Sequence, residues 1–401
     1  MKDKIKVLMF PSDNAGVGHY RQIWPAQQIE SAYGDEFFVE INLDNQDVEY
    51  YKQFDIVHFH RQMGPYENLT SLVSELRKSG VIIVMDIDDY WMPSKTHPMY
   101  VAAMNEKLPE KITAAFKTVD YVTTTTDVFA TYISKYNKNV KVIPNGIDMT
   151  QPMWQNDDFK KSDKVRISWI GGSSHLNDLE ILTTSMNIFH NDESLRGKYQ
   201  FVMCGYDTRG FMTEVGPNGE YLNTRKIAPS ETIWNKFEEI FTDKYNTKII
   251  SEDYKKYLLK CANEDYKKGN VYDGAYVRRW TLPLTRYGEH YNYCDVCLAP
   301  LAENIFNEVK SELKIIEAGL KRKALIAQDY GIYKHLIEDG KTGILVNKND
   351  NTRGWYKAMK RVVEDADYRN SLADNLYKFV KDKYTLEAVT KTRVEFYRQI
   401  I

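Results

Sequence analysis

The chain has 401 residues, which is long enough for two domains that each bury a hydrophobic core of their own. Its 54 Lys and Arg residues nearly balance its 56 Asp and Glu residues, and this balance excludes a global electrostatic attraction to nucleic acid or to an anionic membrane. Four scattered cysteines are too few for a disulfide framework and indicate a reducing compartment, which we expect to be the cytoplasm. We expect no signal peptide and no transmembrane segment, because no apolar run approaches the roughly 20 residues that span a bilayer.

The first predicted strand, Ile5 to Phe10, is apolar except for Lys6, as is typical of a strand buried on both faces. The loop after it contains Gly16 and Gly18, which let the backbone approach a ligand before a helix begins near His19. This strand, glycine loop and helix are a weak signature, because the spacing differs from the dinucleotide fingerprint.

Further strands are predicted at residues 37–42, 54–60, 81–86 and 121–126, with helical stretches between them, and residues 140–148 close the series. Strands that alternate with helices favour a mainly parallel sheet covered on both faces, with ligands at the carboxyl ends of the strands. His58 and His60 alternate along one strand and therefore share a face. A polar strand end at a cleft explains this pair better than a metal site, because no third ligand is evident nearby.

Three aspartates, Asp86, Asp88 and Asp89, crowd the end of the strand at residues 81–86. Such crowding costs free energy unless the acids are solvated, paired or metal-bound, so the sequence predicts a functional site here. One interpretation is a site for a divalent cation that bridges phosphates. The preferred interpretation is that Asp88 or Asp89 accepts hydrogen bonds from ligand hydroxyls. His97, in the following loop, is a candidate to add an imidazole there, and a surface histidine explains it equally well.

The polar run at residues 149–164 predicts a linker, and a buried strand with a glycine turn, Val165 to Gly172, opens the second half. Ser173 and His175 follow this turn, where backbone N–H groups and side chains can hold an anion. A strand is predicted at residues 199–205. The polar, tyrosine-rich stretch at about 206–273 is longer than a simple connection needs and predicts an insertion.

Near the end of this half, Arg279 lies by a predicted strand end, and an apolar run at residues 295–301 predicts another strand. A helix is predicted from Ser311, which places Lys310, Ser311 and Lys314 at its N-terminus. Free N–H groups, a partial positive charge and two lysines suit an anion such as a diphosphate. Glu317, on the same face, suits a ribose diol. On spacing alone, an amphipathic helix with a solvated charged face is the better explanation.

Residues 306–319 and 324–346 resemble the nucleotide-sugar half of GT-B glycosyltransferases of family 4. In that family a glutamate in the sequence EAG or EAM binds the donor ribose, and an upstream basic residue contacts the diphosphate. Glu317 and Lys310 occupy those positions. The acidic residue that the family usually carries eight positions before the ribose glutamate is Val309 here, so the two-glutamate signature is half matched. The pattern resembles a divergent branch that is common in bacterial and phage genomes.

The resemblance implies an α/β fold of the GT-B class, with two Rossmann-like domains facing a central cleft. It places an acceptor-side domain at residues 1–150, and a nucleotide-sugar-binding domain at 165–380 with the insertion at about 206–273. A last helix at 381–401 would pack back on the first domain. The loop after the first strand would face the cleft, which makes His19 and Arg21 candidate cleft residues. Donor contacts are expected from Gly16, Gly18, Gly172, Ser173, His175, Arg279, Lys310, Ser311, Lys314 and Glu317. Catalytic roles are expected for Asp88, Asp89 and His97.

The resemblance further implies a hexosyl- or pentosyltransferase that moves a sugar from a nucleotide diphosphate sugar to a hydroxyl acceptor, with retention. Its partners would be the donor and an unidentified acceptor, with nucleic acid open only as an acceptor. The family usually needs no metal, so we expect no cofactor and no metal site. The arginine and lysine that the family commonly carries after the strand at 165–170 are absent here. A DNA-base glycosyltransferase of phage type, a nucleotide-sugar epimerase or hydrolase, and a non-catalytic sugar-nucleotide-binding protein remain alternatives.

Overall fold

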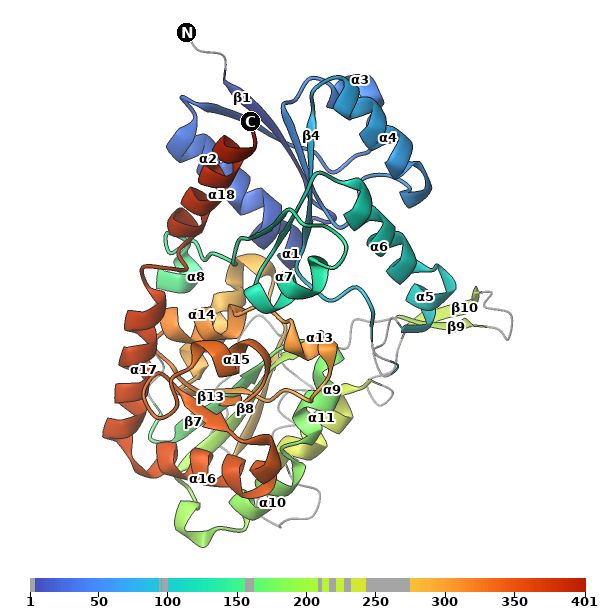
Figure 1. Ribbon diagram of the computed structural model, residues 1–401. Helices are drawn as coiled ribbons and strands as arrows, with labels where there is room; N and C mark the ends of the chain where they lie inside the picture. Colours follow the sequence, from blue (N-terminus) through green and yellow to red (C-terminus); the bar gives the residue numbers. More distant parts are fainter. Residues whose placement is uncertain are drawn as a thin grey trace. The chain divides into compact units, whose positions relative to one another are not determined.

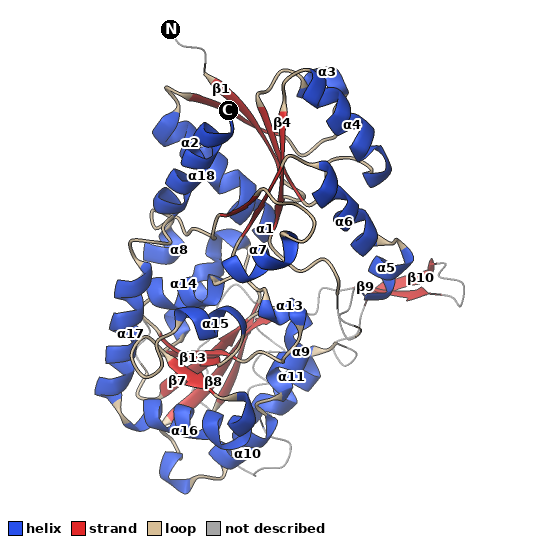
Figure 2. Ribbon diagram, in the orientation of Figure 1, coloured by secondary structure: helices blue, strands red, loops and turns tan. Residues whose placement is uncertain are grey.

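The computed structural model describes residues 4–93, 95, 100–155, 162–207, 211–215, 221–226, 232–242 and 275–401. These residues form two compact units (Figure 1). Unit 1 comprises Met1–Thr150, Asn304–Ile316 and Val380–Ile401, and unit 2 comprises Gln151–Glu303 and Glu317–Phe379. Each unit is built on a six-stranded sheet with helices packed on it (Figure 2), which confirms the predicted α/β class with two domains.

All neighbouring strands in the sheet of unit 1 are parallel, in the order β2-β1-β3-β4-β5-β6. The strands are β1 (Ile5–Phe10), β2 (Phe37–Ile41), β3 (Ile56–His60), β4 (Ile82–Ile87), β5 (Tyr121–Thr124) and β6 (Val140–Val142). Strand order reverses between β1 and β3. In doubly wound sheets, ligands bind at the carboxyl ends of the strands that flank such a switch point.

Helices cover both faces of this sheet (Figure 1). They are α1 (Gly16–Gly18), α2 (Trp24–Tyr33), α3 (Val48–Tyr51), α4 (Tyr66–Lys78), α5 (Tyr100–Asn105), α6 (Leu108–Thr118), α7 (Asp127–Ile133), α13 (Ile305–Glu308) and α18 (Leu386–Ile400). Because successive strand residues point to opposite faces, Val7 and Met9 pack with α2 and α18, whereas Leu8 and Phe10 join the core beneath α4 and α6. A single π-helical turn, His19–Ile23, connects α1 to α2.

The segment Asn304–Ile316 packs with unit 1, although it lies inside the range 165–380 predicted for the second domain. Val309 belongs to the core of unit 1, and the Glu308 carboxylate accepts a hydrogen bond from the Tyr132 hydroxyl at 2.9 Å. Helix α14 (Leu313–Leu320) continues from this segment into unit 2.

The sheet of unit 2 is also parallel, with the order β11-β8-β7-β12-β13-β14 and a switch point between β7 and β12. Its strands are β7 (Val165–Ile170), β8 (Tyr199–Tyr206), β11 (Tyr276–Trp280), β12 (Val296–Ala299), β13 (Ala324–Gln328) and β14 (Ile344–Val346). Its helices are α8 (Pro152–Gln155), α9 (Leu176–Glu180), α10 (Thr183–His190), α11 (Trp234–Thr242), α15 (Gly331–Leu336), α16 (Asn351–Glu364) and α17 (Ala366–Val380).

Most of the predicted insertion at 206–273 lies outside the described residues. Within it the structure describes α11 and an antiparallel pair, β9 (Phe211–Val215) and β10 (Tyr221–Lys226). Across the described parts of the chain, every helix is too short or too polar to cross a lipid bilayer.

Candidate functional site

Polar side chains gather at the switch point of unit 1, in the loops that follow β1, β3 and β4. We call them the unit 1 cluster, which consists of Ser12, Asp13, His60, Arg61, Asp88 and Asp89. The Asp13 carboxylate caps the helix start by accepting hydrogen bonds from the N–H groups of Ala15 at 2.8 Å and Gly18 at 3.2 Å. A Cβ on Gly18 would lie 1.9 Å from the Asp13 carbonyl oxygen, so only glycine permits this tight loop.

Arg61 holds the two outer aspartates of the cluster. Its Nη2 donates to Asp88 Oδ1 at 2.8 Å and to Asp89 Oδ2 at 3.1 Å. Burial disfavours the charge of Asp88, but Arg61 and His60 outweigh burial and hold the pKa of Asp88 well below its ordinary value. Desolvation by the surrounding protein and the Asp88 charge raise the pKa of Asp89, although 45% of its side chain is exposed to solvent. Of the two aspartates that Arg61 holds, Asp89 is the more accessible to a ligand, because the side chain of Asp88 is only 13% exposed.

The backbone of Arg61 has a φ of 60°, a left-handed conformation that costs energy for a residue with a side chain. Its N–H donates to the carbonyl oxygen of Asp86 at 2.9 Å, and the next N–H, of Gln62, returns to the His60 carbonyl at 2.7 Å. These bonds fix the turn after β3 and so aim the guanidinium at the end of β4.

His60 lies within the cluster and is completely buried. Its Nε2 is 2.9 Å from Asp88 Oδ1, and its Nδ1 is 2.7 Å from the Ser12 hydroxyl oxygen. Ser12 itself is exposed. Sequence reasoning did not single out Ser12, Asp13 or Arg61, and their only signal was that each follows a predicted strand.

A second polar network, which includes Asp86, lies inside unit 1. Arg21 and Asp86 are both buried and paired, and the Thr123 hydroxyl donates to Asp86 Oδ1 at 2.5 Å. His58 contacts Thr123 at 3.0 Å and the Tyr397 hydroxyl at 2.6 Å, and burial holds the pKa of His58 well below its ordinary value. The prediction of Arg21 as a cleft residue is wrong, because its side chain is buried and all three guanidinium nitrogens donate to groups of the protein.

In unit 2 the residues after β7 meet the loop after β12. Gly172 precedes a short 3-10 turn, Ser173–His175. His175 Nδ1 lies 2.7 Å from Asp178 Oδ2, and Asp178 Oδ1 accepts a hydrogen bond from the Ala302 N–H at 2.9 Å. Asp178 thus ties His175 to both sides of the switch point of unit 2.

Arg279 lies on β11, and its guanidinium stacks over the Tyr293 ring, 3.4 Å from the centroid. Its neighbour Arg278 points to the other face, where it pairs with Glu238 at 2.7 Å. The ion pair with Glu238 gives Arg278 a structural role. The donor-binding role that the sequence suggests for Arg279 stays a prediction.

The residues predicted to bind the diphosphate and the ribose lie in different units. Lys310, Ser311 and Lys314 lie in the segment that packs with unit 1, and Lys310 acts electrostatically on Asp89. Glu317, in unit 2, is fully buried, and its Oε2 accepts a hydrogen bond from the Tyr291 hydroxyl at 2.6 Å. The described residues therefore bring Lys310 to the unit 1 cluster, while Tyr291 fixes the orientation of Glu317.

The proposed imidazole of His97 lies outside the described residues. Within the described ranges, no group of three or more His, Cys, Asp or Glu side chains is arranged to hold a metal ion.

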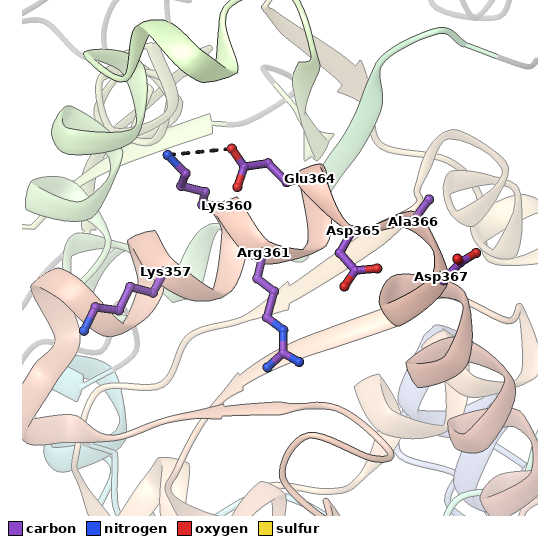
Figure 3. Close-up of a pocket in the computed structure, with 7 residues that line it drawn as sticks. All are labelled: Lys357, Lys360, Arg361, Glu364, Asp365, Ala366 and Asp367. Atoms are coloured by element: carbon purple, nitrogen blue, oxygen red, sulfur yellow. Dashed lines mark ion pairs between the residues drawn. The ribbon is translucent and has the colours of Figure 1, made fainter.

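Unit 2 also has a shallow cavity of about 630 Å³ where α16 ends and α17 begins (Figure 3). It is lined by Lys357, Lys360, Arg361, Glu364, Asp365, Ala366 and Asp367. Helix α16 begins near the carboxyl end of β13, where Gln328 Nε2 donates to Asn351 Oδ1 at 2.8 Å, and then runs about 20 Å away from it. The cavity therefore lies away from the switch point, and we do not assign it to the candidate site.

Comparisons with known proteins find one family model that matches part of the chain and solved structures that share its fold. Residues 251–365 match a family model described as "Glycosyl transferases group 1". A search of curated proteins finds no match.

Three solved structures share the fold. They are a glycosyltransferase from Rickettsia africae (14% identity, covering 99% of both chains, TM-score 0.62), sucrose-phosphate synthase from Thermosynechococcus elongatus (13% identity, covering 100% of this chain and 99% of that one, TM-score 0.61) and HepE from Anabaena in complex with UDP (14% identity, covering 99% of this chain and 100% of that one, TM-score 0.59). At sequence identities of 13–14%, these similarities establish a shared fold only.

Proposed function

We propose that the protein is a retaining glycosyltransferase that moves a hexosyl or pentosyl group from a nucleoside diphosphate sugar to a hydroxyl group. The observation that carries this proposal is the family-model match to residues 251–365, because that range contains Lys310, Ser311, Lys314 and Glu317. The GT-B fold and a structural neighbour that binds UDP support it.

The donor would lie against the switch point of unit 2. The backbone N–H groups after β7, Ser173 and His175 suit a diphosphate, and Arg279 would add positive charge. Glu317 would accept hydrogen bonds from the ribose diol. Because Glu317 is buried, its covering side chains have to move when a ribose binds.

The unit 1 cluster would contact hydroxyls of the sugar or the acceptor through Asp88 and Asp89. Carboxylates suit hydroxyl donors, and Arg61 fixes both acids in place before a ligand arrives. No protein nucleophile and no resident metal is required. The rate enhancement would come from positioning the two substrates and from stabilising the departing diphosphate.

A donor screen by thermal shift tests the proposal, because a ligand at 100 times its dissociation constant adds about 2.7 kcal/mol of stability. UDP-glucose is the first donor to test, followed by other nucleotide sugars. Donors that stabilise the protein are then incubated with oligosaccharides, proteins, small glycosides and hydroxymethylated DNA, and sugar transfer is measured.

The results separate the alternatives. Transfer to a hydroxyl acceptor, with the product anomer matching that of the donor, supports the proposal. Donor consumption that yields free sugar or an epimer identifies a hydrolase or epimerase, and binding without turnover identifies a non-catalytic protein. Transfer to the modified duplex identifies a DNA-base glycosyltransferase.

A further inference from the structure

Glu312 is a buried acid at the point where the segment Asn304–Ile316 becomes helix α14. It is 2% exposed, and its backbone carbonyl accepts hydrogen bonds from the N–H groups of Ile315 at 2.9 Å and Ile316 at 3.1 Å. These bonds fix its backbone to the first turn of α14. Its side chain packs inside unit 1, the unit to which the whole segment belongs.

The two carboxyl oxygens of Glu312 have unequal surroundings. Oε1 accepts a hydrogen bond at 3.1 Å from the N–H of Asn145, which follows β6. Among the residues that the structure describes, none forms a hydrogen bond with Oε2, although solvent does not reach this atom. An ionised carboxylate needs donors at both oxygens, and an unpaired buried charge costs far more free energy than an unpaired buried hydroxyl. The site therefore favours the neutral carboxyl.

The charged and titratable groups that face Glu312 do not reverse this preference. Arg21, in the π-helical turn, attracts a negative charge there, but its nitrogens already donate to Asp86 on β4 and to the Ile143 carbonyl. Tyr384 faces Glu312 from the loop before α18, and each group disfavours the negative charge of the other. Burial outweighs Arg21 and raises the pKa of Glu312 to about 7.

We propose that Glu312 is a pH-sensitive latch, whose neutral carboxyl holds the segment Asn304–Ile316 on unit 1 and whose ionisation favours release of that segment. In the released segment the carboxyl is solvated and has its ordinary pKa of 4.5. The latch therefore holds fully below pH 4.5, weakens as the pH rises to about 7 and changes little above it. Because Lys310, Ser311 and Lys314 lie on this segment, their position depends on the latch.

Two further contacts hold the segment without using the Glu312 carboxyl. Val309 packs in the core of unit 1, and the Glu308 carboxylate accepts a hydrogen bond from the Tyr132 hydroxyl at 2.9 Å. Both contacts persist when Glu312 ionises. The latch therefore sets how often the segment opens, while the docked arrangement stays the resting state.

Hydrogen exchange followed by mass spectrometry tests the latch in the whole protein without any ligand. Protection factors correct for the intrinsic pH dependence of exchange, and they are compared at pH 5.5 and 7.5 for peptides within residues 304–316. In the wild type they should fall about 20-fold as the pH rises, since the pKa differs between 4.5 in the open segment and about 7 in the docked one. In Glu312→Gln they should stay constant, because the amide is neutral at both pH values. Glu308→Gln is the control on the same segment and should keep the wild-type pH dependence.

Urea distinguishes release of the segment from unfolding of unit 1. Because sensitivity to urea scales with the surface that opening exposes, exchange within residues 304–316 at pH 7.5 should hardly change between 0 and 1 M urea, whereas exchange in α4 should rise. Exchange of the segment that rises as steeply as that of α4 would show that the segment opens only when unit 1 unfolds, and would overturn the latch.

Two other outcomes also overturn the latch. One is a wild-type protein whose protection factors within residues 304–316 are equal at the two pH values, a result that needs no variant. The other is a folded Glu312→Gln variant that keeps the wild-type pH dependence. Neither outcome bears on glycosyl transfer, because the latch does not rest on that proposal.

Discussion

Arg21 and Asp86 form an ion pair with two parallel hydrogen bonds in the interior of unit 1. Arg21 Nε donates to Asp86 Oδ2 at 2.9 Å and Nη2 donates to Oδ1 at 2.7 Å. The two side chains are 1% and 0% exposed. The remaining guanidinium nitrogen, Nη1, donates to the Ile143 carbonyl at 2.8 Å, so the pair links the start of α2 to β4 and to the end of β6.

Replacing Arg21 with methionine should destabilise the protein by about 3–5 kcal/mol, because Asp86 would remain as a buried charge without its partner. Urea-induced unfolding followed by circular dichroism measures the change. Arg398→Met is the matched control. Arg398 pairs with Glu36 in the same two-pronged way, but both side chains are over 40% exposed, so the loss should be about 0–1 kcal/mol. Equal losses of stability in the two variants would contradict a special role for the buried ion pair of Arg21 and Asp86.

Glu312 should make unfolding depend on pH. Burial raises its pKa from 4.5 to about 7, although the Asn145 N–H donates to its Oε1 at 3.1 Å. The folded protein thus binds this proton more tightly than the unfolded chain. The stabilising contribution is complete below pH 4.5 and is lost as pH rises through about 7, with a total of ~3 kcal/mol.

The measurement compares the free energy of unfolding of the wild type and Glu312→Gln between pH 4 and 8. The variant should gain stability relative to the wild type as pH rises across this range. Glu75→Gln, at an exposed position on α4, should give a curve parallel to the wild type. Parallel curves for Glu312→Gln would show that this carboxyl does not titrate as described.

The strands could be predicted because both faces of each sheet are covered, so most residues of β1, β3 and β4 are apolar. The partners of the polar residues could not be predicted, because folding brings them together across long stretches of chain. His58 and Tyr397 are 339 residues apart, and Arg21 and Asp86 are 65 apart. Sequence alone grouped Asp86 with Asp88 and Asp89, and only the structure separates a buried structural acid from the two in the unit 1 cluster.

Glu317→Ala should weaken binding of UDP at least tenfold, a loss of about 1.4 kcal/mol, because the ribose would lose its carboxylate partner. Isothermal titration calorimetry measures the affinity. Tyr291→Phe is the control, since it removes the same buried hydrogen bond but keeps the carboxylate. Both variants should lose stability, and Glu317→Ala should lose more affinity than Tyr291→Phe, because Tyr291→Phe keeps the carboxylate. Unchanged affinity in a folded Glu317→Ala protein would show that the ribose assignment is wrong.

Transfer should survive EDTA, because Arg61 already neutralises part of the charge of Asp88 and Asp89, which would otherwise attract a divalent cation. The rate of nucleotide release is measured before and after chelation, and again with added Mn²⁺ or Mg²⁺. Activity that disappears with chelator and returns with metal would favour the cation-binding interpretation of these aspartates.

Helix α18 is the last helix to be synthesised, so unit 1 cannot be completed until the whole chain has been made. The Tyr397 hydroxyl contacts His58, and Arg393 Nη2 donates to the Arg21 carbonyl at 3.0 Å. At a translation rate of ~5–20 residues per second, the ribosome adds α18 about 12–50 seconds after the first 150 residues. Throughout that interval the nascent sheet of unit 1 lacks one of the two helices, α2 and α18, that cover this face, while unit 2 is still being made. Unit 1 starts first and is completed last, so chaperones that shield apolar surface on nascent chains would act on this face.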